Sequence, residues 1–447
     1  MYDVAVIGSG VGGYPAAVLL ARRGLSVALM ESSRIGGTCV NHGCVPAKTL
    51  LHHAHIMLQA LSHGYSIATP PLSKLLEEAR RVASEASQGV KLLLEASGVS
   101  IYECHARIKR GDGSCFLIEC GGERIEARNL ILAPGSKPST PKGVRLGDRV
   151  VVVDDFWYTS IEASRVAVIG GGPAGVEVAE ALACSGVSVD LYEALDTLLP
   201  GLGGLGKTVQ HILKGLGVNI YTSTPVEQAY TSNGGAVVCS RGVCRSYDLV
   251  VVSTGRRPRT SDLGVEAVGV EVDERGFIRL IEGQRTSNPH VYAAGDATGE
   301  PMLAHKAIAE SIAAARMILG EPFYKPRVIP VVIYTSPQLA YVEDPELRGV
   351  DTTSYTLYWS YSLEAKLDSL TPRTCYVKLH YTRDGRIARA ELALPEAASA
   401  AGLLAYIMEH RIPLSKAVEM IPPHPSSLEA VYEAMMEAIG RGYTRAR

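Results

Sequence analysis

Apolar positions along the chain form short runs that alternate with glycine-rich turns and helical stretches. The first apolar run, at residues 3–7, leads into a glycine turn, a helical stretch, a second strand and an acidic residue. The same order returns over residues 167–193. Strands that alternate with helices in this way predict βαβ units and a parallel sheet. We therefore expect one βαβ unit that is present twice.

The pattern between and after the two units predicts the remaining elements. A long helix is expected at 72–96 and a strand-rich meander at 100–132, with short strands at 276–280 and 291–294 and a helix at 302–319. From about residue 327 the pattern changes to strands followed by helices, which is typical of an α+β domain with an antiparallel sheet. Its strands are expected at 328–334, 352–360, 375–381 and 387–394, and its helices at 396–410, 414–420 and 426–439.

Length and composition set the broad class of the protein. The chain has 447 residues, of which 47% are hydrophobic and 20% charged, and this predicts a globular protein with two or three domains. The formal net charge of −2 gives no field that would attract nucleic acid. No apolar run is long enough to cross a bilayer, and the sequence opens on a strand without a leader. We expect a cytoplasmic protein without nucleic-acid, membrane or metal binding.

Both repeats carry glycines at the spacing of a dinucleotide-binding fingerprint. The first glycine permits a tight turn, the second lets the backbone approach a pyrophosphate, and the third lets the helix pack close to the strand. The helix that follows presents free N–H groups and its positive end to the phosphates. The acids that end the second strands, Glu31 and Glu193, can bind ribose hydroxyls. The glycines are Gly8, Gly10 and Gly13 in the first copy and Gly170, Gly172 and Gly175 in the second.

Three pairs of cysteines share one spacing, so spacing alone singles out none of them. The pairs are Cys39/Cys44, Cys115/Cys120 and Cys239/Cys244. The second pair lies in strand-like sequence and the third flanks a hairpin tip, so we expect ordinary buried or hairpin thiols at both. A disulfide within the third pair is the alternative. The first pair follows the fingerprint and precedes a helix, where a flavin could reduce and reoxidise it.

Five motifs in order give the chain a resemblance to a known family. They lie at residues 36–48, 133–135, 253–255, 286–296 and 424–429. Together they make the sequence similar to the pyridine nucleotide–disulphide oxidoreductases with a redox-active cysteine pair, among them dihydrolipoamide dehydrogenase, glutathione reductase and mercuric reductase. The resemblance covers essentially the whole chain.

The resemblance implies an α/β fold with two Rossmann-like dinucleotide-binding domains and a C-terminal α+β dimerisation domain. The FAD-binding domain would be discontinuous, at residues 1–148 and 276–325. The NAD-binding domain would occupy 149–275 and the interface domain 326–447. The family works as a dimer, so a homodimer is implied.

The same resemblance assigns the redox and acid–base residues. Cys39 would be the interchange thiol that exchanges with substrate, and Cys44 would be the thiol that faces the flavin. His424 would act as the acid–base from the other subunit, and Glu429 would hold its ring. Thiolate is the nucleophile in disulfide exchange, so a base near Cys39 is required.

Further positions are implied around the cofactors. Lys48 would lie near the flavin with Glu177 as its acidic partner. Asp296 would contact the ribityl chain of FAD, and Glu31 would hold its adenosine ribose. The remaining cofactor-binding positions are Gly37, Thr38, Gly135 and Gly255. The segment 133–135 carries proline where the family usually has threonine.

The second acidic strand end favours one nicotinamide. Glu193 and Asp196 would repel a 2′-phosphate, and no Arg or Lys is adjacent. NAD is therefore expected rather than NADP.

The substrate is expected to be dihydrolipoamide or a similar small or lipoyl-bearing dithiol, because segments 303–307 and 331–337 are closest to dihydrolipoamide dehydrogenase. The alternatives are a reductase of glutathione disulfide, coenzyme A disulfide or mercuric ion, and a flavin-bearing sensor without turnover. A mercuric reductase should end in two adjacent cysteines, which residues 440–447 lack. An acyltransferase complex is a candidate partner that the sequence leaves open.

Overall fold

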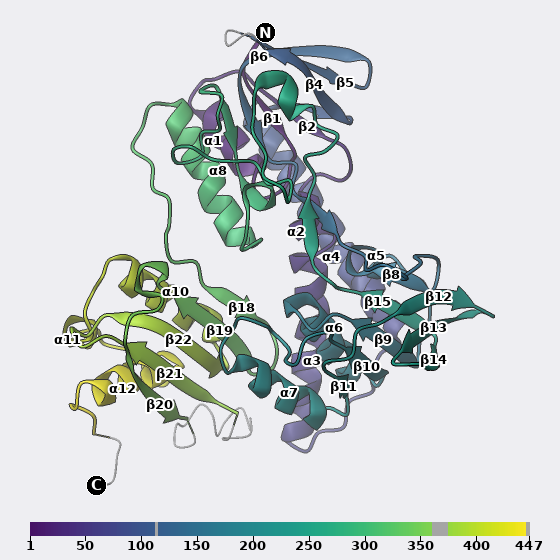
Figure 1. The fold of residues 1–447 in the computed structure, drawn as a ribbon, viewed down its shortest axis with the longest axis vertical. Helices are drawn as coiled ribbons and strands as arrows, with labels where there is room; N and C mark the ends of the chain where they lie inside the picture. Colours follow the sequence, from purple (N-terminus) through teal and green to yellow (C-terminus); the bar gives the residue numbers. More distant parts are fainter. Residues whose placement is uncertain (112–114, 360–373, 444–447) are drawn as a thin grey trace. The chain divides into compact units, whose positions relative to one another are not determined.

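The computed structural model describes residues 1–111, 115–359 and 374–443. Packing divides the chain into two compact units, whose elements are labelled in Figure 1. Unit 1 comprises Met1–Thr49, Leu76–Ser139 and Gly255–Pro326, and unit 2 comprises Leu50–Leu75, Thr140–Thr254 and Arg327–Arg447. Two long helices, α3 (Cys44–Ser62) and α4 (Leu72–Ala96), contribute residues to both units.

Unit 1 is built on a seven-stranded sheet in the order β3-β2-β1-β6-β5-β4, with β17 beside β6. Strands β3, β2, β1, β6 and β17 are parallel, whereas β4, β5 and β6 form an antiparallel meander. The strands are β1 (Tyr2–Ile7), β2 (Val27–Glu31), β3 (Ser100–Glu103), β4 (Ala106–Gly111), β5 (Phe116–Cys120), β6 (Glu123–Leu132) and β17 (Val291–Ala293). Because the apolar runs of β1 and β2 are buried on both faces, they pack as central strands of a parallel sheet.

Two helices cover one face of this sheet. Figure 1 shows α1 (Tyr14–Arg22) and α8 (Ala304–Ile318) side by side, and the Ala16 N–H donates to Ser311 Oγ at 3.0 Å. The small two-stranded sheet of β7 (Ser136–Pro138) and β16 (Arg256–Pro258) also belongs to unit 1. The 3₁₀ helix η1 (Val265–Val268) packs in the core with Ile108. Residues 255–275 therefore pack with the first sheet, although the sequence places them in the second nucleotide-binding domain.

Unit 2 contains the second copy of the repeat. Its five parallel strands have the order β11-β10-β9-β15-β8, and a separate antiparallel sheet has the order β12-β13-β14. The parallel strands are β8 (Val150–Val152), β9 (Arg165–Ile169), β10 (Ser188–Tyr192), β11 (Asn219–Tyr221) and β15 (Leu249–Val252). The antiparallel strands are β12 (Gln228–Ser232), β13 (Gly235–Ser240) and β14 (Val243–Tyr247), and the helices are α5 (Val153–Phe156), α6 (Pro173–Cys184) and α7 (Leu205–Gly215).

The C-terminal part of unit 2 is an antiparallel sheet in the order β18-β19-β22-β21-β20. Its strands are β18 (Val331–Ile333), β19 (Gln338–Glu343), β20 (Thr353–Tyr358), β21 (Tyr376–Tyr381) and β22 (Ile387–Leu394). One face of the sheet packs in a single hydrophobic core with α10 (Ala397–Glu409), α11 (Leu414–Ala417) and α12 (Leu428–Ala438). The α/β fold with two parallel sheets and an α+β C-terminal part is thus the predicted fold class.

The local predictions succeed where the hydrophobic period is long and fail where it is short. The predicted helix at 72–96 is α4, and the helix at 302–319 is α8, shortened at its ends. The predicted strand at 276–280 is wrong, because Ile278 makes only an isolated bridge with Val272. Strand β19 was not predicted, since a short apolar run after a proline is ambiguous. The strand predicted at 352–360 is β20, and residue 360 lies outside the described residues.

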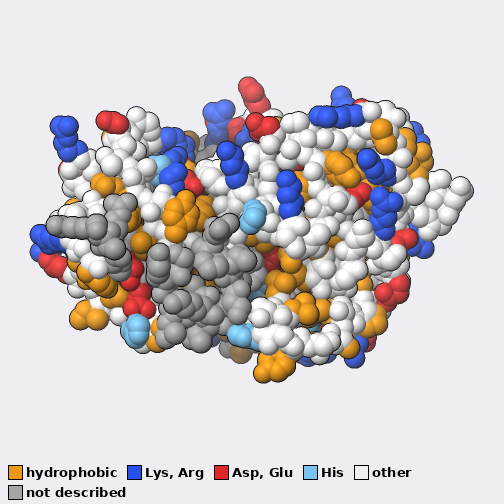
Figure 2. All heavy atoms as spheres, turned by 90° about the horizontal axis from the view of Figure 1, so that it is seen from below, with side chains coloured by type: hydrophobic (Ala, Val, Ile, Leu, Met, Phe, Trp, Pro, Cys, Tyr) orange, Lys and Arg blue, Asp and Glu red, His pale blue; other side chains and the backbone are white. Residues whose placement is uncertain are grey.

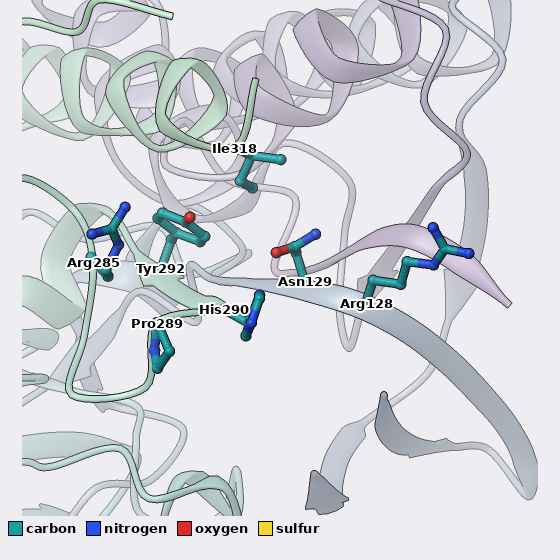
Figure 3. Close-up of a pocket in the computed structure, with 7 residues that line it drawn as sticks. All are labelled: Arg128, Asn129, Arg285, Pro289, His290, Tyr292 and Ile318. Atoms are coloured by element: carbon teal, nitrogen blue, oxygen red, sulfur yellow. The ribbon is translucent and has the colours of Figure 1, made fainter. Parts of the chain in front are cut away.

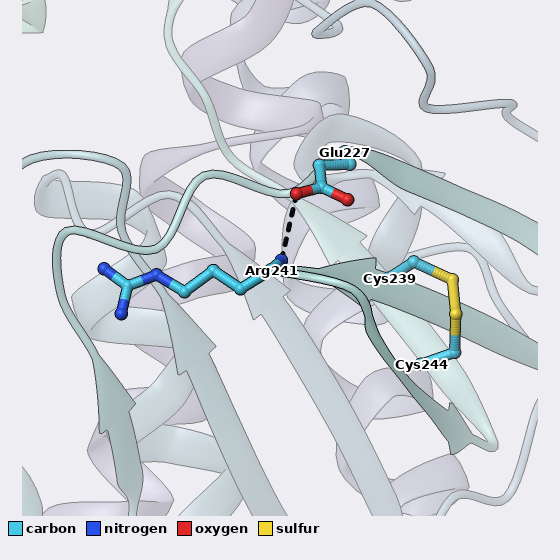
Figure 4. The surroundings of a disulfide bond; sticks show 4 residues. All are labelled: Glu227, Cys239, Arg241 and Cys244. Atoms are coloured by element: carbon cyan, nitrogen blue, oxygen red, sulfur yellow. Dashed lines mark hydrogen bonds between the residues drawn. A yellow bond between two sulfur atoms is a disulfide. The ribbon is translucent and has the colours of Figure 1, made fainter.

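Two disulfides correct the expectation of free thiols. Cys239 and Cys244 face each other across the β13–β14 hairpin and are bonded, with their Cα atoms 4.1 Å apart (Figure 4). The backbone N–H of Arg241 at the hairpin tip donates to Glu227 Oε1 at 3.0 Å. Cys120 is also bonded, but to Cys104 of the β3–β4 connection. The antiparallel pairing of β4 with β5 brings these two cysteines together. They are far apart in the sequence, so their spacing did not predict the bond.

The surface agrees with the near-neutral composition. On the face drawn in Figure 2, basic and acidic side chains both occur and are interspersed with hydrophobic ones. None of the helices in the described ranges has the length and apolar character that crossing a bilayer would need.

Candidate active site

The cysteine segment is built directly onto the first glycine turn. Cys39 lies on the short helix α2 (Gly37–Asn41), and Cys44 is the first residue of α3. Gly37 has a φ of 61°, and a Cβ atom added there would lie 2.7 Å from the Cα of Gly10. The absence of a side chain at residue 37 therefore lets the cysteine segment contact the dinucleotide turn.

Both cysteines are half-buried thiols that take no part in a disulfide bond. The hydrogen bond with Cys44 and burial raise the pKa of the Cys39 thiol, although the positive charge of Lys48 opposes the shift. The Cys39 thiol is therefore protonated at neutral pH, so a base must remove its proton before it can act as a nucleophile. Asn41 shapes the segment, because its buried side-chain amide donates to the Ile35 carbonyl at 2.9 Å and the Gly37 carbonyl at 3.1 Å.

The two acidic strand ends make the same hydrogen bonds in both repeats. Glu31 accepts the Ser9 N–H on Oε2 and the Ser33 N–H on Oε1, both at 2.9 Å. Glu193 accepts the Gly171 N–H on Oε2 at 2.7 Å and the Leu195 N–H on Oε1 at 2.8 Å. The two repeats thus share their hydrogen bonds as well as their sequence pattern. In each repeat the carboxylate connects the glycine turn with the residues that follow the carboxylate's own strand.

Ser9 is a site residue that the sequence reading missed. Its hydroxyl donates to Glu31 Oε2 at 2.6 Å and accepts the Gly36 N–H at 3.1 Å. Ser9 therefore links the glycine turn, Glu31 and the start of the cysteine segment. Ser9 occupies the variable position of the G-x-G motif. Its place in the motif could have indicated a role, but the motif requires no particular residue type there.

The motif at residues 286–296 ends next to the same glycine turn. Asp296 lies in the 3₁₀ helix η2 (Gly295–Thr298), and a Cβ atom added to Gly12 would lie 3.3 Å from the Cα of Gly295. Asp296 Oδ2 accepts a hydrogen bond from the Ser136 hydroxyl, and Arg256 Nε donates to that hydroxyl oxygen at 2.7 Å. Unit 1 therefore gathers the fingerprint, the cysteine segment and Asp296 at the carboxyl end of β1.

The glycines leave room for a dinucleotide. A Cβ atom added to Gly8 or Gly13 in the first turn, or to Gly170 or Gly175 in the second, would clash with a backbone carbonyl oxygen, so both turns demand glycine. At Gly172, Gly135 and Gly255 an added Cβ atom would meet nothing within 4 Å. Backbone at these three positions is open to a ligand, which fits the close approach that a pyrophosphate requires.

In unit 2, both acidic residues of α6 that face the segment after β18 accept backbone hydrogen bonds. Glu177 Oε1 accepts the Tyr334 N–H at 2.9 Å, and Glu180 Oε1 accepts the Ser336 N–H at 2.8 Å. Glu180 is fully buried, and burial raises the pKa of its carboxyl to about 6, against the opposing effect of His55. Lys48 belongs to unit 1, and its pairing with Glu177 stays a prediction.

The C-terminal pair meets as the motif spacing suggests. His424 Nδ1 lies 2.8 Å from Glu429 Oε1, and Glu429 Oε2 accepts the Ser426 N–H at 3.1 Å. Glu429 is in the first turn of α12, whereas the His424 side chain is 73% exposed. The histidine ring is therefore oriented from one side and open to a partner on the other.

A groove of about 630 Å³ in unit 1 lies away from these residues. It lies beside Arg128 and Asn129 of β6 and the start of β17, and Figure 3 shows Ile318 on one side of Tyr292 and Asn129, with His290 and Pro289 on the other. None of the predicted site residues lines it. The cofactor-binding end of a parallel sheet is its carboxyl end, so this groove is not the site described above.

Comparisons with known proteins give a consistent result. The family model described as "Pyridine nucleotide-disulphide oxidoreductase" matches residues 2–311. The dihydrolipoyl dehydrogenase of Haloferax volcanii is 31% identical over 98% of this chain and 96% of its own length. A dihydrolipoyl dehydrogenase of Pseudomonas aeruginosa is 30% identical over 98% of this chain and 97% of its own length.

Solved structures show the same fold. LpdA from Mycobacterium tuberculosis has a TM-score of 0.89 at 22% identity and covers 98% of this chain and 99% of its own. The HOCl-induced flavoprotein disulfide reductase RclA from Escherichia coli has a TM-score of 0.86 at 23% identity and covers 97% of this chain and 99% of its own.

Proposed function

Because the chain belongs to the pyridine nucleotide–disulphide oxidoreductase family, we propose that it is an FAD-dependent enzyme that transfers electrons between a dihydrolipoamide-like dithiol and NAD. The observation that carries this proposal is the close approach of Gly37 to Gly10, which places the two thiols of Cys39 and Cys44 next to the first glycine turn. The dihydrolipoyl dehydrogenases that match over nearly their full length support the choice of substrate.

The residues of unit 1 would hold FAD. The turn of Gly8, Gly10 and Gly13 and the start of α1 would face its pyrophosphate, Glu31 its ribose and Asp296 its ribityl chain. When bound, FAD supplies two-electron transfer between the thiol pair and the nicotinamide. The remaining chemistry belongs to the protein side chains. The turn of Gly170, Gly172 and Gly175, with Glu193, would hold NAD.

The thiol exchange follows from the two cysteines. With the pair oxidised, a substrate thiolate attacks Cys39 Sγ, breaks the bond to Cys44 and leaves Cys44 as a thiolate. The second substrate thiol then displaces Cys39, which completes the substrate disulfide and the reduced pair. Oxidation of the dithiol releases two electrons and two protons, of which NAD⁺ takes both electrons and one proton.

The second proton needs a base, and His424 is the proposed one. A neutral imidazole takes the proton of the attacking thiol, and its imidazolium then stabilises the thiolate of Cys39. Glu429 fixes the tautomer, because Nδ1–H donates to its carboxylate and leaves Nε2 free to accept. We propose that this histidine comes from the second subunit of a homodimer, for which residues 326–447 would form the interface.

The proposed compartment and partners follow from the chemistry. NAD as electron carrier favours the cytoplasm, while the two disulfides are features that a reducing compartment usually lacks. A lipoyl group carried by an acyltransferase complex is the proposed partner if the substrate is protein-bound. The FAD-binding, NAD-binding and interface domains are proposed at 1–148 with 276–325, 149–275 and 326–447, although residues 255–275 pack with the sheet of unit 1.

A substrate panel tests the proposal. Purified protein is assayed with dihydrolipoamide and NAD⁺, and in reverse with NADH and lipoamide, glutathione disulfide, coenzyme A disulfide or Hg²⁺. We expect turnover with the lipoamide couple and much faster flavin reduction by NADH than by NADPH, because Glu193 and Asp196 repel a 2′-phosphate. A protein that takes up no flavin, or that turns over glutathione disulfide and not lipoamide, would overturn it.

A further inference from the structure

We propose that Lys306 and Glu310 are positioning residues that hold Asp296 in place for FAD. The inference rests on the proposed flavin site, and it assigns a role to a buried ion pair that none of the five family motifs includes. Lys306 and Glu310 lie one turn apart on α8, with Lys306 Nζ 3.0 Å from Glu310 Oε1. Only 8% of Lys306 and 4% of Glu310 is exposed.

The pair is joined to both ends of the 3₁₀ helix that carries Asp296. Glu310 Oε2 accepts the Gly295 N–H at 2.8 Å and the Thr298 hydroxyl at 2.9 Å. Lys306 Nζ donates to the Thr298 hydroxyl oxygen at 3.0 Å and to the Gly299 carbonyl at 3.2 Å. The three donor hydrogens of the ammonium group therefore have three acceptors, and η2 is fixed before and after Asp296.

Asp296 is held from its other side as well. Its Oδ2 accepts the Ser136 hydroxyl, which Arg256 fixes in turn. For Oδ1, no hydrogen bond or ion pair is found within the described part of the chain, and the residue is half-buried. The arrangement thus fixes the backbone of Asp296 and one of its oxygens and leaves the other oxygen for a ligand hydroxyl.

Burial of both charges distinguishes this pair from an exposed ion pair on a helix surface. Two buried charges contribute little net stability, but the loss of one leaves the other uncompensated. Such a pair specifies one geometry rather than adding stability, and a carboxylate must be placed closely to bind a cofactor hydroxyl. Loss of either charge is expected to move η2 and with it Asp296.

The experiment compares this buried pair with an exposed pair of the same spacing. Glu310→Gln, Lys306→Met and the double variant are titrated as apoprotein with FAD, beside Glu85→Gln. Arg81 and Glu85 form an i,i+4 pair on α4 with side chains 58% and 60% exposed. We expect each single change at the buried pair to weaken FAD binding on the order of tenfold, partial rescue in the double variant, and no change for Glu85→Gln.

A double-mutant cycle distinguishes positioning from general packing. If Glu310 acts through Asp296, then Glu310→Gln should cost little further FAD affinity in an Asp296→Asn background. Additive losses, or unchanged FAD affinity in Glu310→Gln, would overturn the inference. Should Glu310→Gln fail to fold, Thr298→Val removes the bridging hydroxyl and is expected to show the same non-additivity. A wild-type protein that binds no FAD would instead refute the proposed function.

Discussion

His424 Nδ1 lies 2.8 Å from Glu429 Oε1, so a carboxylate orients the exposed imidazole. The Glu429 carboxylate is itself fixed by the backbone N–H of Ser426. This chain of contacts is short and local, because all three residues lie within one turn and the start of one helix. In the proposed mechanism these contacts would prepare the ring to exchange a proton at Nε2.

Replacement of the histidine should remove acid–base help without loss of the fold. For His424→Gln we expect lipoamide turnover to fall by roughly 10²- to 10⁴-fold. Glu429→Gln should cause a smaller loss, because the base remains and only its orientation weakens. Steady-state kinetics with circular dichroism as a fold control would check both. Near-normal turnover of His424→Gln would take the histidine out of the mechanism.

The two cysteines should differ in their spectroscopic effects. For Cys44→Ser we expect FAD to remain bound but the long-wavelength charge-transfer band of the two-electron-reduced enzyme to be lost, because the proposed flavin-facing thiolate is gone. Cys39→Ser, the matched control, should keep a thiolate next to the flavin and therefore keep long-wavelength absorbance. Anaerobic titration with NADH measures both. Persistence of the band in Cys44→Ser would contradict the assignment of the two sulfurs.

Glu180 should make the free energy of unfolding depend on pH. Burial raises its folded-state pKa from 4.5 to about 6, so the neutral carboxyl is the form that the fold favours. The contribution of this group is complete below pH 4.5 and is lost as pH rises through about 6. Relative to Glu180→Gln, the wild-type protein should lose about 2 kcal/mol in total from well below pH 4.5 to well above pH 6.

Urea denaturation of the wild type and Glu180→Gln at several pH values between 4 and 8 would measure this difference. Subtraction cancels groups that titrate alike in the two proteins. A difference that does not change with pH would show that Glu180 is not neutralised by burial.

The two disulfides should stabilise the protein by different amounts. Cys104 and Cys120 are 16 residues apart, and Cys239 and Cys244 only 5. Loop-closure entropy then predicts losses of about 3 kcal/mol for Cys104→Ala and about 2 kcal/mol for Cys239→Ala. Denaturant unfolding under oxidising and reducing conditions tests this, because reductant should abolish both differences. Cys115, which is in neither disulfide, is the control, and Cys115→Ala should respond to reductant no more than the wild type does.

Peptide mapping without reductant gives an independent check of the disulfide pairing. Linked peptides should contain Cys104 with Cys120 and Cys239 with Cys244. Recovery of Cys115 joined to Cys120 would contradict the pairing that the sheet predicts. Cys120 would then be bonded to the cysteine five residues away and not to Cys104.

Much of the site was readable because its requirements are local. In each turn one glycine is required by its neighbours, because a Cβ atom added to Gly13 or Gly175 would clash with the carbonyl oxygen of the glycine five residues earlier. The five resembling motifs placed the cysteine segment, Asp296 and the histidine pair along the chain. The structure brings His424 to Glu429, and it brings the cysteine segment to the first glycine turn through Gly37 and Gly10.

Contacts between distant segments were not readable. Glu310 reaches back to Gly295 across a turn, Ser9 reaches Gly36, and Cys120 bonds Cys104 rather than the equally spaced Cys115. No residue type or spacing along the chain required these pairs. They follow from how the elements pack.

The sequence by itself determined the twofold βαβ repeat and the parallel arrangement of its strands, because hydrophobic period and turn chemistry act over neighbouring residues. Tertiary structure alone decided which cysteines are bonded, which carboxylates are buried and what holds Asp296. The physical reason is that desolvation and hydrogen bonding depend on which atoms meet after the chain has folded, and those atoms come from segments far apart in the sequence.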